Sequence, residues 1–314
     1  MQTEVHVRKA RPADHEAIAV VLTRAYPTEP PIDGETVTWA LARVDPDRPH
    51  ASLVADVGGT VVGSAFLRGV PARPGLMLNL EVIPAHRRRG IGTRLLDAVV
   101  ADVGETPFTM WTVISEEDVG SLTFAACHGF VERDRMFESS LDLATFQPDA
   151  FLEARESALA RGIRFTTLSA EDRPALRRQL YELTDQLDRD IPSVEPLQSS
   201  SYDEWVSGWL EAPHSRADLL AIAFDGDRPV AVSSIIVMPD GTAFNHMSGV
   251  LASHRGQGLG LAVKVEALRL AQGAGIGEVR TDNHARNGPM LAINARLGYR
   301  RRPTFIELAR VAPT

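Results

Sequence analysis

The chain has 314 residues, of which 44% are apolar and 24% charged, so it is typical of a folded protein about two domains long. Its net charge of −8 argues against a nucleic-acid partner held through phosphates and weakly favours a cationic substrate. No apolar run approaches the roughly 18 to 20 residues that a membrane span needs, and residues 1–9 lack a signal-peptide profile. We therefore expect a cytoplasmic protein without a membrane or nucleic-acid partner.

The first half shows apolar patterns that predict a mixture of strands and helices in the order βααβββαβαββ. The elements with clear signals are a hairpin of residues 52–57 and 61–66 turned at Gly58-Gly59, a strand at 76–83, a helix at 93–103, a strand at 108–114 and a short helix ending at Gly129. A final pair of strands is expected after that helix. The single cysteine, Cys127, lies in this apolar-periodic region, and we expect a buried structural thiol.

The second half repeats the same order of elements. Its signals are a hairpin of residues 219–224 and 230–237 turned at Asp225-Gly226, a strand at 244–251, a helix at 261–274, a strand at 278–281 and a short helix ending at Gly298. Residues 149–161 have helix-forming composition, and Gly162 can end that helix. The predicted organisation is a domain at 1–148, a helical linker at 149–162 and a domain at 163–314.

Two landmarks make the repeat specific. The pattern Arg-x-x-Gly-x-Gly at 87–92 recurs at 255–260, 168 positions later, and Gly129-Phe130 recurs as Gly298-Tyr299, 169 positions later. Each glycine pattern lies between a predicted strand and a predicted helix. One such copy can be a plain tight turn, but glycines also let successive N–H groups face one concavity at the positive end of a helix. Two copies in the same context favour binding of a pyrophosphate.

The two glycine patterns do not match the common sequence motifs that bind ATP or NAD. The chain lacks Gly-x-x-x-x-Gly-Lys-Ser/Thr, and both glycine turns follow an antiparallel hairpin rather than the first strand of a parallel sheet. The nine histidines are dispersed, without His-Glu-x-x-His spacing, so no metal is expected. No Gly-x-Ser-x-Gly turn suggests a serine hydrolase.

The segments VIPAHRRRGIGT at 82–93 and VLASHRGQGLG at 250–260 resemble the acetyl-CoA motif of the GNAT superfamily of N-acyltransferases. The resemblance implies an α/β (α+β) fold of two tandem domains, each a mixed, mostly antiparallel twisted sheet flanked by helices. It further implies that backbone amides of both turns hold the pyrophosphate of acetyl-CoA and that the strands at Val82 and Val250 pair with the pantetheine arm. An amide there would polarise the thioester carbonyl. The implied cofactor-binding residues are Val82, Ile83, Arg87, Arg88, Arg89, Gly90, Ile91, Gly92, Thr93, Val250, Leu251, Arg255, Gly256, Gln257, Gly258, Leu259, Gly260, Leu261 and Asn287.

The family's second motif, Asn-x-x-Ala-x-x-x-Tyr-x-x-x-Gly-Phe, is only partly present. Its asparagine, which meets coenzyme A in the family, matches Asn287, but Met290 replaces alanine and Asn294 replaces the tyrosine that serves as acid. In the first half, the corresponding positions hold Asp118, Ser121 and Ala125. Neither half therefore has the tyrosine acid.

Candidates for the base that takes a proton from the amine differ between the halves. Glu81 precedes Val82 and is well placed to act directly or through water, although a solvated strand carboxylate would look the same in the sequence. The equivalent position in the second half is Gly249, where Ser248 and His246 are nearby polar groups and Asp282 or His284 could be the base. Asn294 could donate a hydrogen bond to sulfur but cannot transfer a proton. The asparagine motif gives the second half a slight preference for catalysis, and both turns are expected to hold coenzyme A.

The resemblance implies an acetyl-CoA-dependent N-acetyltransferase in which a primary amine, expected to belong to a small molecule, attacks the thioester directly. Two alternatives stay open at this point: acetylation of a protein, and a non-catalytic protein that binds or senses acyl-CoA. The acceptor lies beyond the sequence because acceptor specificity resides in variable loops. A monomer or a homodimer is expected.

Overall fold

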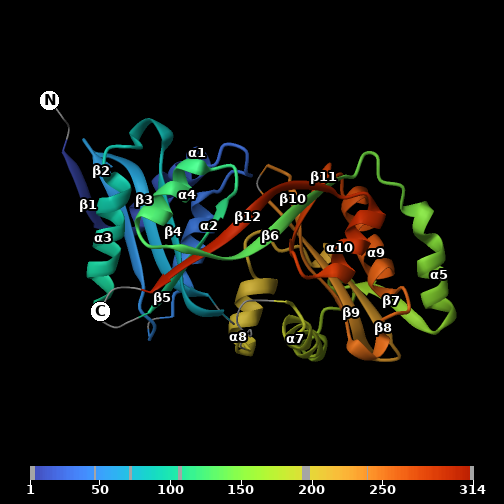
Figure 1. Ribbon diagram of the computed structural model, residues 1–314. Coiled ribbons are helices and arrows are strands. Elements are labelled where there is room, and N and C mark those ends of the chain that lie inside the picture. Colours follow the sequence, from blue (N-terminus) through green and yellow to red (C-terminus); the bar gives the residue numbers. More distant parts are fainter. Residues whose placement is uncertain are drawn as a thin grey trace. The chain divides into compact units, whose positions relative to one another are not determined.

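The computed structural model describes residues 4–45, 47–70, 73–104, 108–192, 199–238 and 240–311. The chain divides into two compact units, which are described separately (Figure 1). The N-terminal unit comprises Met1–Asp134 and Ile306–Thr314, and the C-terminal unit comprises Arg135–Phe305. The boundaries drawn from the repeat, at 148 and 163, stay a prediction for the repeated segments.

The N-terminal unit is a mostly antiparallel sheet with strand order β1-β2-β3-β4-β5-β12. Its elements are β1 Val5–Lys9, α1 His15–Ala25, α2 Gly34–Ala42, β2 Ala51–Val57, β3 Thr60–Val70, β4 Arg73–Val82, α3 Ile91–Val103, β5 Thr109–Ser115, α4 Val119–Cys127, the start of β6 Val131–Asp142 and the end of β12 Arg300–Val311. The predicted hairpin is present: Val57 pairs with Thr60, and Gly58 and Gly59 have φ of 61° and 85°. Positive φ at both central residues is what a tight two-residue hairpin turn needs.

Helices cover both faces of this sheet. Alternation along the strands sends Leu53, Leu67 and Leu78 into a core shared with Leu95 and Leu96 of α3. A smaller apolar cluster on α1, α2 and β2 is formed by Ile18, Ala19, Val37 and Val54. Side chains between α1, α2 and the sheet therefore occupy a layer separate from the one under α3.

The C-terminal unit repeats this plan with strand order β6-β11-β10-β9-β8-β7. Its elements are α5 Leu152–Ala160, β7 Ile163–Thr167, α6 Leu168–Glu171, α7 Pro174–Asp188, α8 Tyr202–Trp205 with a π-helical turn Val206–Leu210, β8 Leu220–Asp225, β9 Arg228–Val237, β10 Ala243–Val250, α9 Leu259–Gly273, β11 Glu278–His284 and α10 Gly288–Leu297. On β10, Gly249 lies against Leu187 of α7, whereas the next residue, Val250, lies against Gly260 of α9. Because neighbouring strand residues point to opposite faces, α7 and α9 cover opposite faces of this sheet.

The last strands differ from expectation. Instead of a strand pair after each short helix, each half has one strand of twelve residues, β6 and β12. The segment that forms β6 contains neither glycine nor proline, the two residue types that most strongly interrupt a strand. Most of β6, from Arg135 on, belongs to the C-terminal unit, and β12 from Ile306 on belongs to the N-terminal unit. Each unit thus takes a strand from the other half of the sequence.

Cys127, predicted to be buried, is exposed because it ends α4 on the side away from the core residue Ala125. Across the residues that the structure describes, no helix combines the length and the hydropathy that crossing a membrane would require.

Candidate active site

The two glycine turns have nearly the same backbone. Gly90 and Gly258 adopt left-handed φ of 76° and 77° and stand at the N-caps of α3 and α9. Two residues earlier, Arg88 and Gly256 have φ of 60° and 73°. The second left-handed position is therefore filled by glycine in the C-terminal unit and by arginine in the N-terminal unit, where a side chain makes that conformation less favourable.

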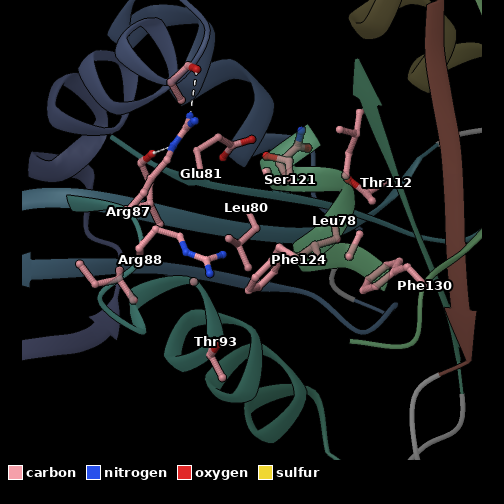
Figure 2. A pocket seen from close by; sticks show the side chains of 18 of the residues that line it. Leu78, Leu80, Glu81, Arg87, Arg88, Thr93, Thr112, Ser121, Phe124 and Phe130 are labelled. Atoms are coloured by element: carbon pink, nitrogen blue, oxygen red, sulfur yellow. Dashed lines mark hydrogen bonds between the residues drawn. The ribbon is translucent and has the colours of Figure 1, made fainter. Parts of the chain in front are cut away.

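Arginine side chains brace both turns from within. Arg87 Nε donates to the carbonyl oxygen of Val82 at 2.9 Å, and Arg255 Nε donates to that of Val250 at the same distance. Arg87 also donates to Ala25 O at 3.1 Å; Figure 2 shows both of its bonds as dashed lines. These arginines, predicted among the cofactor-binding residues, thus hold each turn against the end of the preceding strand.

The amides at the start of each helix are uncapped. The first bonds of the α3 and α9 ladders run from Arg94 N to Gly90 O and from Ala262 N to Gly258 O, both 3.1 Å. The N–H groups of residues 91–93 and 259–261 precede them, and the N-cap glycines have no side chain that could accept a hydrogen bond from these groups. Such a group of amides at the positive end of a helix is suited to an anion.

Next to each turn, two parallel strands separate. In the N-terminal unit, β4 pairs with β5 only at Leu76 with Met110 and Met77 with Trp111. In the C-terminal unit, β10 pairs with β11 only at two positions, ending at Phe244 with Arg280. Beyond these pairs the two strands diverge. The backbone N–H and C=O groups on their facing edges can then form hydrogen bonds with an extended ligand that lies between the strands.

In the N-terminal unit, the divergence opens into a cavity of about 410 Å³ (Figure 2). One end is the glycine turn, including Arg88, Gly90 and Thr93. The walls come from the separated ends of β4 and β5 and from α4, with apolar side chains at Leu78, Leu80, Ile114, Phe124 and Phe130. This volume falls in the range of pockets that bind small molecules.

Glu81 also lines this cavity. Its side chain is 4% exposed, and its residue pairs across the sheet with Ser64 of β3. Burial raises the pKa of the Glu81 carboxyl to about 8, while a hydrogen bond with Ser64 acts in the opposite direction. Figure 2 shows Glu81 and Ser121 pointing towards each other from β4 and α4. Glu81 is therefore a buried group that exchanges a proton near neutral pH, as a general base does.

The equivalent place in the C-terminal unit is filled differently. A Cβ added to Gly249, the counterpart of Glu81, would lie 2.6 Å from Leu187 Cδ1. The side chain of Leu187, which is 4% exposed, therefore occupies the space where the N-terminal unit has its carboxylate. An apolar side chain there cannot accept a proton.

The predicted residue Ser248 belongs to a network of hydrogen bonds at a β-bulge. Its hydroxyl donates to Asn245 Oδ1 at 2.8 Å and lies 2.9 Å from Ser233 Oγ. Asn245 Nδ2 donates to Ser233 Oγ and to one backbone oxygen on each of the two strands, Ser234 O on β9 and Met247 O on β10. These contacts hold an irregular strand in shape.

The other predicted residues of the C-terminal unit lie in three different surroundings. Asp282 is exposed on β11, while Thr281 beside it is buried. Asn287 caps α10 by accepting from Met290 N at 3.4 Å, as Asp118 caps α4 by accepting from Ser121 N at 2.9 Å. Asn294 is 2% exposed and donates to Asn283 Oδ1.

One buried group was missed by sequence reasoning. Lys264 of α9 is 1% exposed, with Nζ 3.9 Å from Met290 Sδ and 5.0 Å from the centre of the Tyr299 ring. Burial lowers the pKa of Lys264 to about 7. Lys264 is the counterpart in α9 of Leu96 in α3. A residue-by-residue comparison of the two helices would have revealed it, whereas a search for apolar spacing did not.

The fold and the uncapped turns define a family. The family model described as Acetyltransferase (GNAT) family matches residues 16–130 and 178–299, and the chain belongs to this family. The match of two regions confirms the tandem arrangement predicted from the repeat. The predicted class, an acetyl-CoA-dependent N-acetyltransferase, is confirmed as well.

The individual relatives have low sequence identity to this chain, but the matches cover most of its length. The chain is 28% identical over 257 residues to a mycothiol acetyltransferase of Clavibacter michiganensis subsp. michiganensis, covering 81% of this chain and 78% of the relative. It is 25% identical over 275 residues to one of Saccharopolyspora erythraea, covering 82% and 84%. Among solved structures, a tandem GNAT protein from the clavulanic acid biosynthesis pathway has a TM-score of 0.75 at 20% identity, covering 99% of both chains. A GCN5-related N-acetyltransferase from Sphaerobacter thermophilus has 0.72 at 20% identity, covering 99% and 96%. These structures share the fold of this chain.

Proposed function

We propose that the N-terminal unit binds acetyl-CoA in its 410 Å³ cavity and acetylates a small primary amine, with Glu81 as the general base. One observation carries the proposal: a single cavity joins the glycine turn to a buried carboxylate. The slight preference that the asparagine motif gave to the C-terminal unit is outweighed, because Leu187 fills the corresponding space there.

The residues of the N-terminal unit suit acetyl-CoA. Its diphosphate would lie on the amides of residues 91–93, where the helix start offers donors and positive potential. Its pantetheine arm would follow the free edge of β4 beyond Met77. The apolar wall at Leu80 and Phe124 would keep water away from the thioester.

The chemistry then needs one proton acceptor. The amine nitrogen attacks the carbonyl carbon of the thioester, a C–N bond forms and the C–S bond breaks. Glu81, in its ionised form, accepts the proton that nitrogen loses. The sulfur departs as a thiolate, and because thiols ionise near a pKa of about 8.5, it requires no strong acid. The absence of the tyrosine from both halves is therefore compatible with turnover.

The acceptor class rests on the relatives. Several are named mycothiol acetyltransferase, which supports a small molecule rather than a protein as the acceptor. Protein acetylation and non-catalytic binding of acyl-CoA become outcomes of the test: acetylated lysine on added proteins without turnover of small amines would favour the first, and binding without thiol release would favour the second.

A matched pair of substitutions tests where acetyl-CoA binds. A Cβ at Gly90 or at Gly258 meets no atom within 4 Å, and aspartate tolerates left-handed φ better than most residues. Gly90→Asp would place a carboxylate beside the diphosphate; Gly258→Asp does the same in the C-terminal unit. We expect Gly90→Asp to weaken acetyl-CoA binding at least about tenfold and to reduce thiol release, relative to Gly90→Asn as the neutral control.

The pair also shows how the proposal would fail. If Gly258→Asp, but not Gly90→Asp, abolishes amine-dependent thiol release, catalysis belongs to the C-terminal unit. If Gly90→Asp and Gly90→Asn bind acetyl-CoA equally well, no diphosphate lies at this turn.

A further inference from the structure

A second, smaller cavity lies on the other face of the N-terminal sheet. It has a volume of about 180 Å³ and is lined by α1, α2 and the strands β2, β3 and β4. Asn79 and Glu81 line this cavity as well as the larger one. The buried carboxylate therefore stands between a space suited to acetyl-CoA and a separate space that a second molecule could enter.

Most of the smaller cavity is apolar. Its walls include Ile18, Leu22, Ile32, Val37 and Leu41, which pack together between α1 and α2. An apolar wall of this kind favours a hydrocarbon body, at roughly 25 cal/mol for each Å² removed from water. Along this wall, an acceptor with many hydroxyl groups would lose hydration without gaining hydrogen-bond partners.

Besides Glu81, one further ionisable side chain, Arg68, interrupts the apolar lining. Arg68 of β3 is half-buried, and its guanidinium carbon lies 5.6 Å from the centre of the Phe66 ring. Its Nε atom is buried and finds no hydrogen-bond acceptor among the described residues. A buried N–H without an acceptor costs free energy unless a ligand supplies one. Arg43 lies near enough to lower the pKa of Arg68 further than burial alone, so positive charge accumulates at this end.

The register of the strands separates the two polar ends. Ser64 pairs with Glu81, and Arg68 pairs with Met77, so the charged ends lie four residues apart along β3. At about 3.3 Å per residue this is roughly 13 Å between backbone positions, less the reach of both side chains. Because residues two apart share a face, Ser64, Phe66 and Arg68 form one continuous floor between these ends.

We infer that the acceptor is an amine with an apolar body and a carboxylate at its far end, held by Arg68 while its amino group meets Glu81. The Nε and Nη2 edge of arginine matches the two oxygens of a carboxylate. This inference rests on the proposed function, since it assigns the acceptor to the cavity that shares Glu81.

Two probes of equal chain length test the carboxylate: 6-aminohexanoate and hexylamine. For the wild-type protein we expect 6-aminohexanoate to have a KM at least tenfold lower than that of hexylamine. Arg68→Gln should remove this preference by raising the KM for 6-aminohexanoate much more than the KM for hexylamine. Arg68→Lys keeps the charge and should restore part of the preference.

The control removes the same charge elsewhere. Arg24 is exposed at the end of α1 and does not line this cavity, so Arg24→Gln should retain the wild-type preference. Thermal unfolding of each variant checks that the fold is intact. A series with 4-aminobutanoate and 8-aminooctanoate then locates the best chain length.

Equilibrium binding separates this inference from the proposed function. Titration calorimetry should show acetyl-CoA binding to Arg68→Gln as to wild type, and 6-aminohexanoate binding to wild type only. If wild type shows no preference for the carboxylate, or if Arg68→Gln weakens both amines equally, the inference is wrong even where Glu81 proves to be the base. If 6-aminohexanoate binds through Arg68 but Glu81→Gln keeps full activity, the proposed function fails and the binding site stands.

Discussion

The two units place nearly identical glycine turns in front of very different interiors. In both, an arginine braces the turn at 2.9 Å and a left-handed glycine begins the helix. Behind the turn, the N-terminal unit has Glu81, whereas the C-terminal unit has Gly249 at the corresponding position, and Leu187 fills the space beside that glycine. Conversely, the C-terminal unit buries Lys264 where the N-terminal unit has Leu96. A glycine turn of this kind therefore indicates where an anion can bind. The catalytic chemistry depends on residues at other positions, which the sequence of the turn does not fix.

The largest expected effect is on activity. Glu81→Gln keeps the shape of the side chain but removes the base, so we expect kcat to fall by about 10²- to 10⁴-fold. Asp282→Asn, the corresponding test in the C-terminal unit, should leave kcat within about twofold because this side chain is exposed on its strand. Amine-dependent thiol release measures both. The reverse pattern, with loss only in Asp282→Asn, would move catalysis to the C-terminal unit.

Stability gives a control for that loss. The carboxyl of Glu81 has a pKa of about 8 when folded and about 4.5 when unfolded, so the unfolded state is favoured progressively as pH rises between these values. Glu81→Gln should therefore raise the free energy of unfolding at pH 8 by a few kcal/mol, of order 1.4 kcal/mol per pKa unit, and by much less at pH 5. Denaturant unfolding at the two pH values measures this difference. A more stable protein with lost activity identifies a catalytic rather than a structural role.

The second prediction exchanges the buried lysine and leucine. Above pH 10.5 Lys264 is neutral in both states; as pH falls towards 7 only the unfolded state gains the proton, and stability is lost. Lys264→Leu should thus stabilise the protein at pH 7 by a few kcal/mol. Leu96→Lys should destabilise it by a similar amount. Equal unfolding midpoints for Lys264→Leu and wild type would mean that another group compensates this ammonium.

The third prediction concerns the pH profile. Below pH 8 Glu81 is mostly protonated, so kcat should rise about tenfold per pH unit until it levels near 8. The hydrogen bond with Ser64 holds the pKa of Glu81 down, so Ser64→Ala should shift the profile to higher pH. Burial raises the pKa of the Tyr26 hydroxyl, which lines the same cavity, so Tyr26→Phe should leave the shape of the profile between pH 6 and 9 unchanged. A flat profile from pH 6 to 9 would argue that Glu81 is not the base.

The smallest effect compares the two left-handed positions before the helices. Arg88 has φ of 60°, so Arg88→Gly should stabilise the N-terminal turn by up to about 1 kcal/mol. Gly256→Ala, at φ of 73°, should cost about the same in the C-terminal turn. Thermal unfolding detects both changes. Loss of acetyl-CoA affinity in Arg88→Gly would show that the arginine is retained for its charge.

Much of the fold could be predicted because its signals are local. Gly58-Gly59 marks a hairpin, and the strand-turn-helix units around both glycine patterns are present as expected. The single long strands β6 and β12 could not be predicted, because their pairing depends on segments far apart in the chain. The region of Asn245 and Ser248 read as plain strand, whereas the structure has a bulge held by side chains.

The site was predictable to a similar extent. Glu81 was a candidate because it precedes the turn, but its burial depends on packing by other elements. Arg68 carried no signal, since it follows the strand predicted at 61–66 and an arginine is ordinarily a solvated residue. Leu187 lies on a helix some sixty positions before Gly249, and only the folded chain brings the two together.

A crystal structure with acetyl-CoA tests the central claim most directly. We predict that acetyl-CoA fills the N-terminal cavity, with its diphosphate on the amides of residues 91–93. The thioester carbon and the Glu81 carboxylate should be separated by room for one nitrogen atom, about 3 Å from each. Acetyl-CoA bound only at the C-terminal turn, with Glu81 remote from the thioester, would contradict the account.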